Sequence, residues 1–135
     1  MFNQEIPLKE WREFCESFSR EHHGWLVSVG LVNTQQLEHE ETIPKDQLQI
    51  LADNYPLQEV MEAQKDDDVE FMVTVGKGTN ESSYLIKDVV RLYAQKENGG
   101  HKGLRIDSRN ATTTLVQFRA AAEPQALDGL AESEL

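Results

Sequence analysis

Near the start of the chain, apolar residues recur every three or four positions. This spacing is typical of one face of a helix, and it is followed by Leu8, Trp11, Phe14, Cys15 and Phe18. Pro7 suits a first helical turn, and Gly24 suits the residue that ends a helix. The pattern predicts an amphipathic helix over residues 7–22.

After Gly24 the apolar period changes from 3.6 to two. Residues 25–32 alternate in this way and predict a strand, and a weaker, more polar alternation over 37–43 predicts an exposed second strand. Over 44–54, Pro44 at a first turn and apolar residues on one side favour a short helix. We expect extended chain over 55–64, near Pro56.

The second half of the chain consists of short apolar alternations separated by turn residues. The predicted strands are 69–75, 84–86, 89–94, 104–108 and 112–119. Residues 84–86 and 89–94 could also form one strand bent at residues 87–88. The predicted turns are at 66–68, 76–80, 98–100 and 109–110.

One helix followed by consecutive strands with short turns predicts an α+β fold. We expect the N-terminal helix to pack on a curled, mainly antiparallel sheet of about six strands. Partial closure into a barrel is an alternative way to protect the sheet edges. Residues 1–119 would form a single domain, and residues 120–135, with four acidic and no basic side chains, a mobile acidic tail.

The composition fits an ordinary globular domain. The chain has 135 residues, of which 39% are hydrophobic and 27% charged. Its single cysteine, Cys15, excludes an internal disulfide. No apolar run approaches the ~20 residues of a membrane span, and the first residues do not resemble a signal peptide. We therefore expect a cytoplasmic protein without membrane contact.

The charge is uneven and points to one candidate binding surface. The net charge is −11, yet residues 87–119 contain seven basic and three acidic side chains. If the apolar residues of these strands face the core, Arg91, Arg105 and Arg119 face outward. Lys87, Lys102 and Arg109 would join them at the turns. Such a face could bind an anion or an acidic protein. We favour the simpler interpretation that these cations pair with carboxylates of this chain or of a second copy.

Three other motifs lack the spacing that their chemistry needs. Gly76-Lys77-Gly78-Thr79 lacks the first glycine of a phosphate-binding loop, and Asp66-Asp67-Asp68 lacks the alternating ligands of a calcium loop. Adjacent helical residues such as His22 and His23 point about 100° apart, which disfavours one shared metal. Cys15 lies two turns before His22, but it belongs to the apolar stripe. We predict no metal and no cofactor.

Several segments together resemble a known family. They are Ile6-Pro7 through Trp11, Phe18-Ser19-Arg20 through Val27, Pro56-Leu57-Gln58, Leu104 through Ser108, and Thr112 through Arg119. They are similar to a bacterial family of small proteins, domain-of-unknown-function family 5335. The resemblance covers most of residues 5–119, and this chain has extra residues between about 33 and 54. It implies a bacterial cytosolic domain, and it transfers no activity and no site residue.

Three functions remain open from the sequence. The first is a non-catalytic binding or protein-interaction module that forms a homodimer or binds an acidic protein. The second is a small hydrolase-like, anion-binding enzyme that uses His39 or His101 with the arginine face. The third, weak nucleic-acid binding through Arg91, Arg105 and Arg119, has little support, because only Tyr93 is available for stacking beside them.

Overall fold

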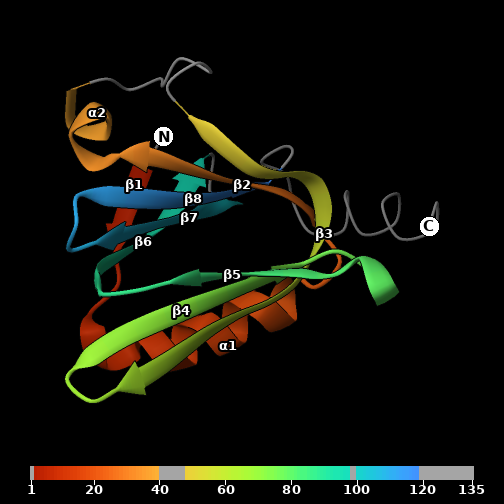
Figure 1. The fold of residues 1–135 in the computed structure, drawn as a ribbon, viewed down its shortest axis with the longest axis horizontal. Coiled ribbons are helices and arrows are strands. Elements are labelled where there is room, and N and C mark those ends of the chain that lie inside the picture. The colour runs from red at the N-terminus through yellow and green to blue at the C-terminus, as the bar shows by residue number, and fades with distance from the viewer. Residues whose placement is uncertain (1, 40–47, 98–99, 119–135) are drawn as a thin grey trace.

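The computed structural model describes residues 2–39, 48–97 and 100–118. It is an α+β fold in which eight strands form one antiparallel sheet, in the order β1-β6-β7-β8-β2-β3-β4-β5. The strands are β1 (Phe2–Glu5), β2 (Leu26–Asn33), β3 (Gln49–Lys65), β4 (Asp68–Val75), β5 (Ser82–Ile86), β6 (Val89–Glu97), β7 (Gly100–Ser108) and β8 (Thr112–Phe118). Helix α1 (Trp11–Glu21) lies behind β4 in the view of Figure 1.

Helix α1 forms where the apolar stripe predicts it. A short 3₁₀ turn, η1 (Leu8–Glu10), follows Pro7 and leads into the helix, and His22 is the C-terminal cap. The helix buries Trp11, Cys15 and Phe18, which are three of the five stripe residues. The predicted helix over 7–22 is therefore confirmed, and its apolar face supplies the aromatic part of the core.

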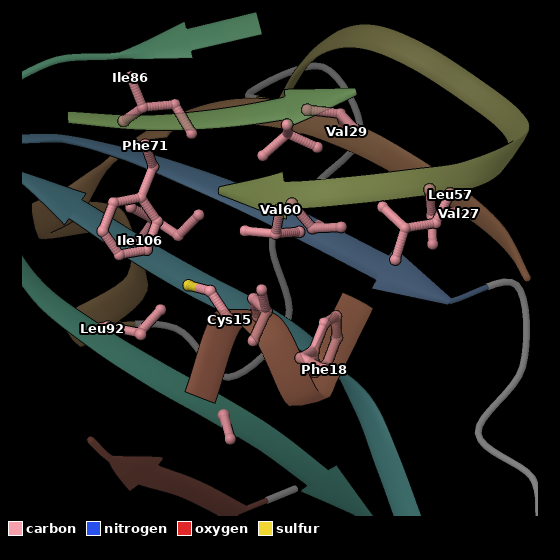
Figure 2. Close-up of a cluster of buried hydrophobic side chains, with 14 of the residues drawn as sticks. Cys15, Phe18, Val27, Val29, Leu57, Val60, Phe71, Ile86, Leu92 and Ile106 are labelled. Atoms are coloured by element: carbon pink, nitrogen blue, oxygen red, sulfur yellow. The ribbon is translucent and has the colours of Figure 1, made fainter. Parts of the chain in front are cut away.

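Strand β3 belongs to two layers of the curled sheet. Its first half, from Gln49 to Pro56, pairs with β2, and its second half, from Leu57 to Lys65, pairs with β4. The hydrophobic core lies between the layers and α1. Figure 2 shows Val27 of β2, Val60 of β3, Phe71 of β4 and Ile106 of β7 converging on Cys15 and Phe18 of the helix.

Helix α1 also covers a backbone edge that β2 leaves open. The Ser19 hydroxyl accepts a hydrogen bond from the Val60 amide (2.8 Å) and lies 3.0 Å from the Val60 carbonyl. Just after the helix, the Gly24 amide donates to the Leu57 carbonyl, and the Leu57 amide donates to the Trp25 carbonyl. The second half of β3 is thus bonded on both sides, by β4 and by the end of the helical segment.

The structure corrects the prediction for residues 37–54. Residues 34–39 form a short helix, α2 (Thr34–His39), where a strand was expected from residue 37. Residues 49–54 are part of β3, where a helix was expected. Residues 40–47 lie outside the described residues. Pro44 and the spacing of Leu48, Leu51 and Ala52 suggested the helix, but sheet pairing with β2 decides the conformation.

The sheet is larger than predicted and is not closed. It has eight strands instead of about six. β1 was not predicted, whereas β5 and β6 are the two separate strands expected over 84–86 and 89–94. β1 and β5 are the two ends of the strand order and do not pair with each other. The predicted tail, 120–135, lies outside the described residues. Within the described ranges, no helix is long and apolar enough to cross a membrane.

Candidate functional site

Arg105, a predicted outward cation, is buried in an ion pair. It lies on the face opposite Leu104 and Ile106, as the alternation predicts, but only 8% of its surface is exposed. Its Nε and Nη2 donate to the two carboxylate oxygens of Asp107 (2.9 and 3.0 Å), and the Thr113 hydroxyl donates to the same carboxylate. The Arg105 guanidinium also lies 4.9 Å from the centre of the Tyr93 ring. Arg105 therefore stabilises the fold through this internal ion pair.

The other predicted basic residues do not form one open face with Arg105. Lys102 pairs with Glu97 (3.4 Å), and Arg109 pairs with Asp68 of β4 (3.6 Å). Arg91 is exposed on β6, opposite Asp107 in the register, and Lys87 is exposed between β5 and β6. Arg119 lies outside the described residues. Three of the six cations thus have a carboxylate of this chain as partner.

Sequence reasoning missed a contact between two distant histidines. His22 is 4% exposed, and its Nδ1–H donates to the Phe18 carbonyl (2.8 Å), which leaves Nε2 as an acceptor. Nδ1 of His101 lies 3.4 Å from that Nε2. Burial, and then the neighbouring His22 and Lys96, lower the pKa of His101, while Glu21 acts in the opposite direction. Burial among these aromatic rings therefore favours the neutral form of His101.

A bulge in β7 explains why His101 lies near the helix instead of beside Arg105. Gln95 pairs with Gly103, but the next residue, Lys96, pairs with His101, so β7 has one extra residue. Gly103 permits the close approach, since a Cβ there would lie 2.1 Å from the Val116 carbonyl oxygen. The side chain of His101 consequently contacts Phe18 and His22. The enzyme hypothesis needed His101 beside the arginine face, and the bulge separates them. The side chain of His39, the other histidine of that hypothesis, is not among those described.

Cys15 has the character of a core residue. It is 1% exposed, and burial, followed by the charges of Glu62 and Glu16, raises the pKa of its thiol to about 12. A thiol with such a pKa is protonated at neutral pH and is a poor nucleophile. Among the described residues, no three His, Cys, Asp or Glu side chains are grouped so as to hold a metal ion.

An apolar row crosses the outer face of β3, β4 and β5. Met61 lies opposite Met72, and Met72 lies opposite Leu85, so the three side chains share one face. Met61 is 43% exposed, Leu85 is 50% exposed, and Met72 is half-buried. We call these three residues the methionine–leucine row. The sequence indicates this row by an apolar residue at a solvent-facing position of each of the strands β3, β4 and β5.

The methionine–leucine row ends at the edge of the sheet. β5 is the last strand of the order and pairs with β4 alone, beside which it runs in Figure 1. Beside the row, Thr74 and Ser83 are hydrogen bonded across the strands. A wide polar groove of about 780 Å³ separates this face from α1, and Glu81 and Arg20 line it. Among the described residues, Met61 and Leu85 are the exposed large apolar side chains of this layer.

The model of the Family of unknown function (DUF5335) matches residues 2–129. The chain belongs to this family. The match confirms the resemblance read from the sequence, and it extends past residue 119, where we expected the domain to end. No curated protein and no solved structure matches the chain.

Proposed function

We propose that this family member is a non-catalytic protein-interaction module that associates with a second copy of itself through β5 and the methionine–leucine row. The observation that carries the proposal is the position of this row. Exposed apolar side chains at Met61 and Leu85 continue up to the edge of β5, which pairs with no strand other than β4 among the described residues. Contiguous apolar surface of this kind is typical of interaction sites, and open strand edges pair readily with another strand.

The features of the candidate catalytic groups support a binding role. Arg105 is neutralised by Asp107, His101 is separated from it by the bulge at Gly103, and the Cys15 thiol is buried and protonated. A catalytic site needs a nucleophile or base together with a group that stabilises charge. These residues are each used in packing or in internal pairing, so they support the fold.

The setting that we propose is the bacterial cytoplasm. The single thiol supports it, because a chain that cannot form an internal disulfide suits a reducing compartment. The net charge of −11 supports a solution protein in place of one that coats nucleic acid. An acidic protein as partner is an alternative that would use the exposed Arg91 and Lys87.

Sedimentation velocity of the full chain over a range of concentrations tests the proposal. We expect a dimer whose dissociation constant rises at least about tenfold in Leu85→Lys, because the charge replaces an apolar contact at the edge. Ile50→Lys is the matched control, since Ile50 is also 50% exposed but lies in the first half of β3, away from the row. A wild-type protein that stays monomeric at the highest attainable concentration contradicts the proposal. So does an equal effect of both substitutions.

A further inference from the structure

The sequence of β5 lacks the usual protection of an edge strand. Natural edges carry charged side chains, prolines or bulges that prevent pairing with another chain. The five residues of β5, Ser82 to Ile86, contain no charge and no proline, and their register with β4 is regular throughout. Ser82, Ser83 and Leu85 are exposed. An added strand would therefore meet a regular and uncharged edge.

Opposite charges lie at the two ends of this strand. Glu81 immediately precedes β5 and Lys87 immediately follows it, and both side chains are exposed. Neither forms an ion pair with another described residue. The edge thus begins with a negative charge and ends with a positive one, and the two charges are the same number of residues from Tyr84.

The equal spacing of Glu81 and Lys87 from Tyr84 favours a second copy of the chain as the partner. In antiparallel pairing centred on Tyr84, Ser83 lies opposite Leu85 of the second copy and Ser82 lies opposite Ile86 of the second copy. The next position on each side places Glu81 opposite Lys87 of the second copy, and this occurs twice because the arrangement is two-fold symmetric. Moving the centre to Ser83 or Leu85 removes both charge pairs.

We propose that two copies join edge to edge through β5, antiparallel about a two-fold axis at Tyr84, with Glu81 of each copy paired to Lys87 of the other. This register places the outer faces of both copies on the same side of the joined sheet. The two methionine–leucine rows then approach across the new junction, because Leu85 and Ser83 of the second copy are directly opposite. The inference rests on the proposed function and names its partner and its register.

Charge reversal provides the decisive experiment. In Glu81→Lys, the introduced lysine of each copy would lie opposite Lys87 of the other copy. In Lys87→Glu, the introduced glutamate would lie opposite Glu81 of the other copy. Each substitution acts at both ends of the junction, so we expect the dissociation constant to rise about tenfold or more in either variant. Mixing the two variants should restore a dimer without like-charge contacts, provided that the chains pair in the proposed register.

In the mixed dimer, the two ends of the junction are no longer equivalent. At one end the introduced lysine of Glu81→Lys meets the introduced glutamate of Lys87→Glu, and at the other end Lys87 of the first variant meets Glu81 of the second. Both ends are then attractive pairs, so the mixture should give a heterodimer of wild-type affinity. The double variant E81K/K87E should also return to wild-type affinity, because it exchanges the two charges of every pair.

Matched controls separate this register from a general effect of net charge. Glu13→Lys on α1 and Lys9→Glu in η1 change the charge of the chain by the same amounts at exposed positions away from β5. They should leave the dissociation constant within about twofold of the wild type. A heterodimer is detected by labelling one variant with ¹⁵N and measuring the mass of the intact dimer by native mass spectrometry.

Disulfide trapping gives a second and independent readout. A mixture of Ser83→Cys and Leu85→Cys chains should cross-link under mild oxidation faster than either variant alone, because only the mixed pair places two cysteines opposite each other. The native Cys15 should not interfere, since it is buried with a thiol pKa of about 12.

The outcomes distinguish the two proposals. The β5 register is overturned if the wild type and the charge-reversal variants dimerise equally well and the cysteine mixture shows no preferred cross-link. The proposal of self-association is not contradicted by that result. A failure of the mixture to recover affinity that both single reversals lose also overturns the register. A strictly monomeric wild type overturns self-association, and the register with it.

Discussion

Ser19 takes the place of a neighbouring strand beside Val60. Its hydroxyl oxygen accepts from the Val60 amide at 2.8 Å and lies 3.0 Å from the Val60 carbonyl. The hydroxyl also lies 2.7 Å from the Cys15 carbonyl, so its single proton has two carbonyls within reach. Its oxygen satisfies the Val60 amide on the side of β3 that β2 does not reach. The contact ties the helix to the long strand at the point where that strand changes partners.

We expect Ser19→Ala to lower the free energy of unfolding by about 1–3 kcal/mol, because the Val60 amide loses its acceptor in a partly buried position. Urea unfolding measures the change. Ser17→Ala is the matched control on the same helix, since the Ser17 hydroxyl accepts from Arg20 at an exposed position, and it should cost less than about 0.5 kcal/mol. Equal costs for the two variants would contradict the role given to Ser19.

Asp107→Ala should be among the most destabilising polar substitutions in the described chain. It removes the two hydrogen bonds that the Asp107 carboxylate accepts from the buried Arg105 guanidinium, and it removes the acceptor of Thr113. Breaking a buried ion pair from one side costs about 3–5 kcal/mol. The comparison is Asp68→Ala, which breaks the exposed pair with Arg109 and should cost at most about 1 kcal/mol in the same urea titration.

The stability should depend on pH through His101. Because burial lowers its folded-state pKa below the ordinary value of 6.5, the unfolded chain takes up the proton first as the pH falls. The folded state therefore loses stability as the pH falls through 6.5, until the folded-state pKa is reached. We expect the stability of the wild type relative to His101→Gln to fall as the pH is lowered through 6.5.

Urea unfolding at several pH values measures this difference. His23→Gln, made at an exposed histidine that is hydrogen bonded to Gln58, is the matched control for replacing an imidazole by an amide. A wild type and a His101→Gln variant with parallel stability profiles would show that His101 does not titrate differently in the two states.

The Cys15 thiol should react only when the fold opens. At about pH 8 an aromatic disulfide reagent should modify it within seconds in urea and far more slowly in the native protein, because the buried thiol has a pKa of about 12. Absorbance of the released thiolate follows the reaction. Rapid labelling of the native protein at the unfolded rate would be inconsistent with a core position for Cys15.

The residues that fit a regular period were predictable, and those whose conformation depends on distant pairing were not. The stripe of Trp11, Cys15 and Phe18 indicated the helix, and the alternation over 69–75 indicated β4. Residues 49–54 contain one fully buried side chain, Ala52, and end at Asn54 with a φ of 67°, so no two-residue period is visible there. β1 was missed because its residues 3–5 are polar on both faces.

The candidate site also combines contacts that the sequence indicates with contacts that depend on distant pairing. Arg105 and Asp107 are two residues apart on one strand face, so their pairing could have been inferred from the sequence. The contact between His22 and His101 could not, because the two residues are 79 positions apart and meet only through the bulge at Gly103. The apolar row was visible strand by strand, but its continuity depends on the cross-strand register of β3, β4 and β5.

The length of β3 has a consequence for how the molecule unfolds. Its 17 residues belong first to the layer of β2 and then to the layer of β4, without an intervening loop. Neither layer can lose its pairing without disturbing backbone that the other layer also uses. We therefore expect the two layers to melt as one cooperative unit, so that the slowest-exchanging amides of both report the same opening free energy.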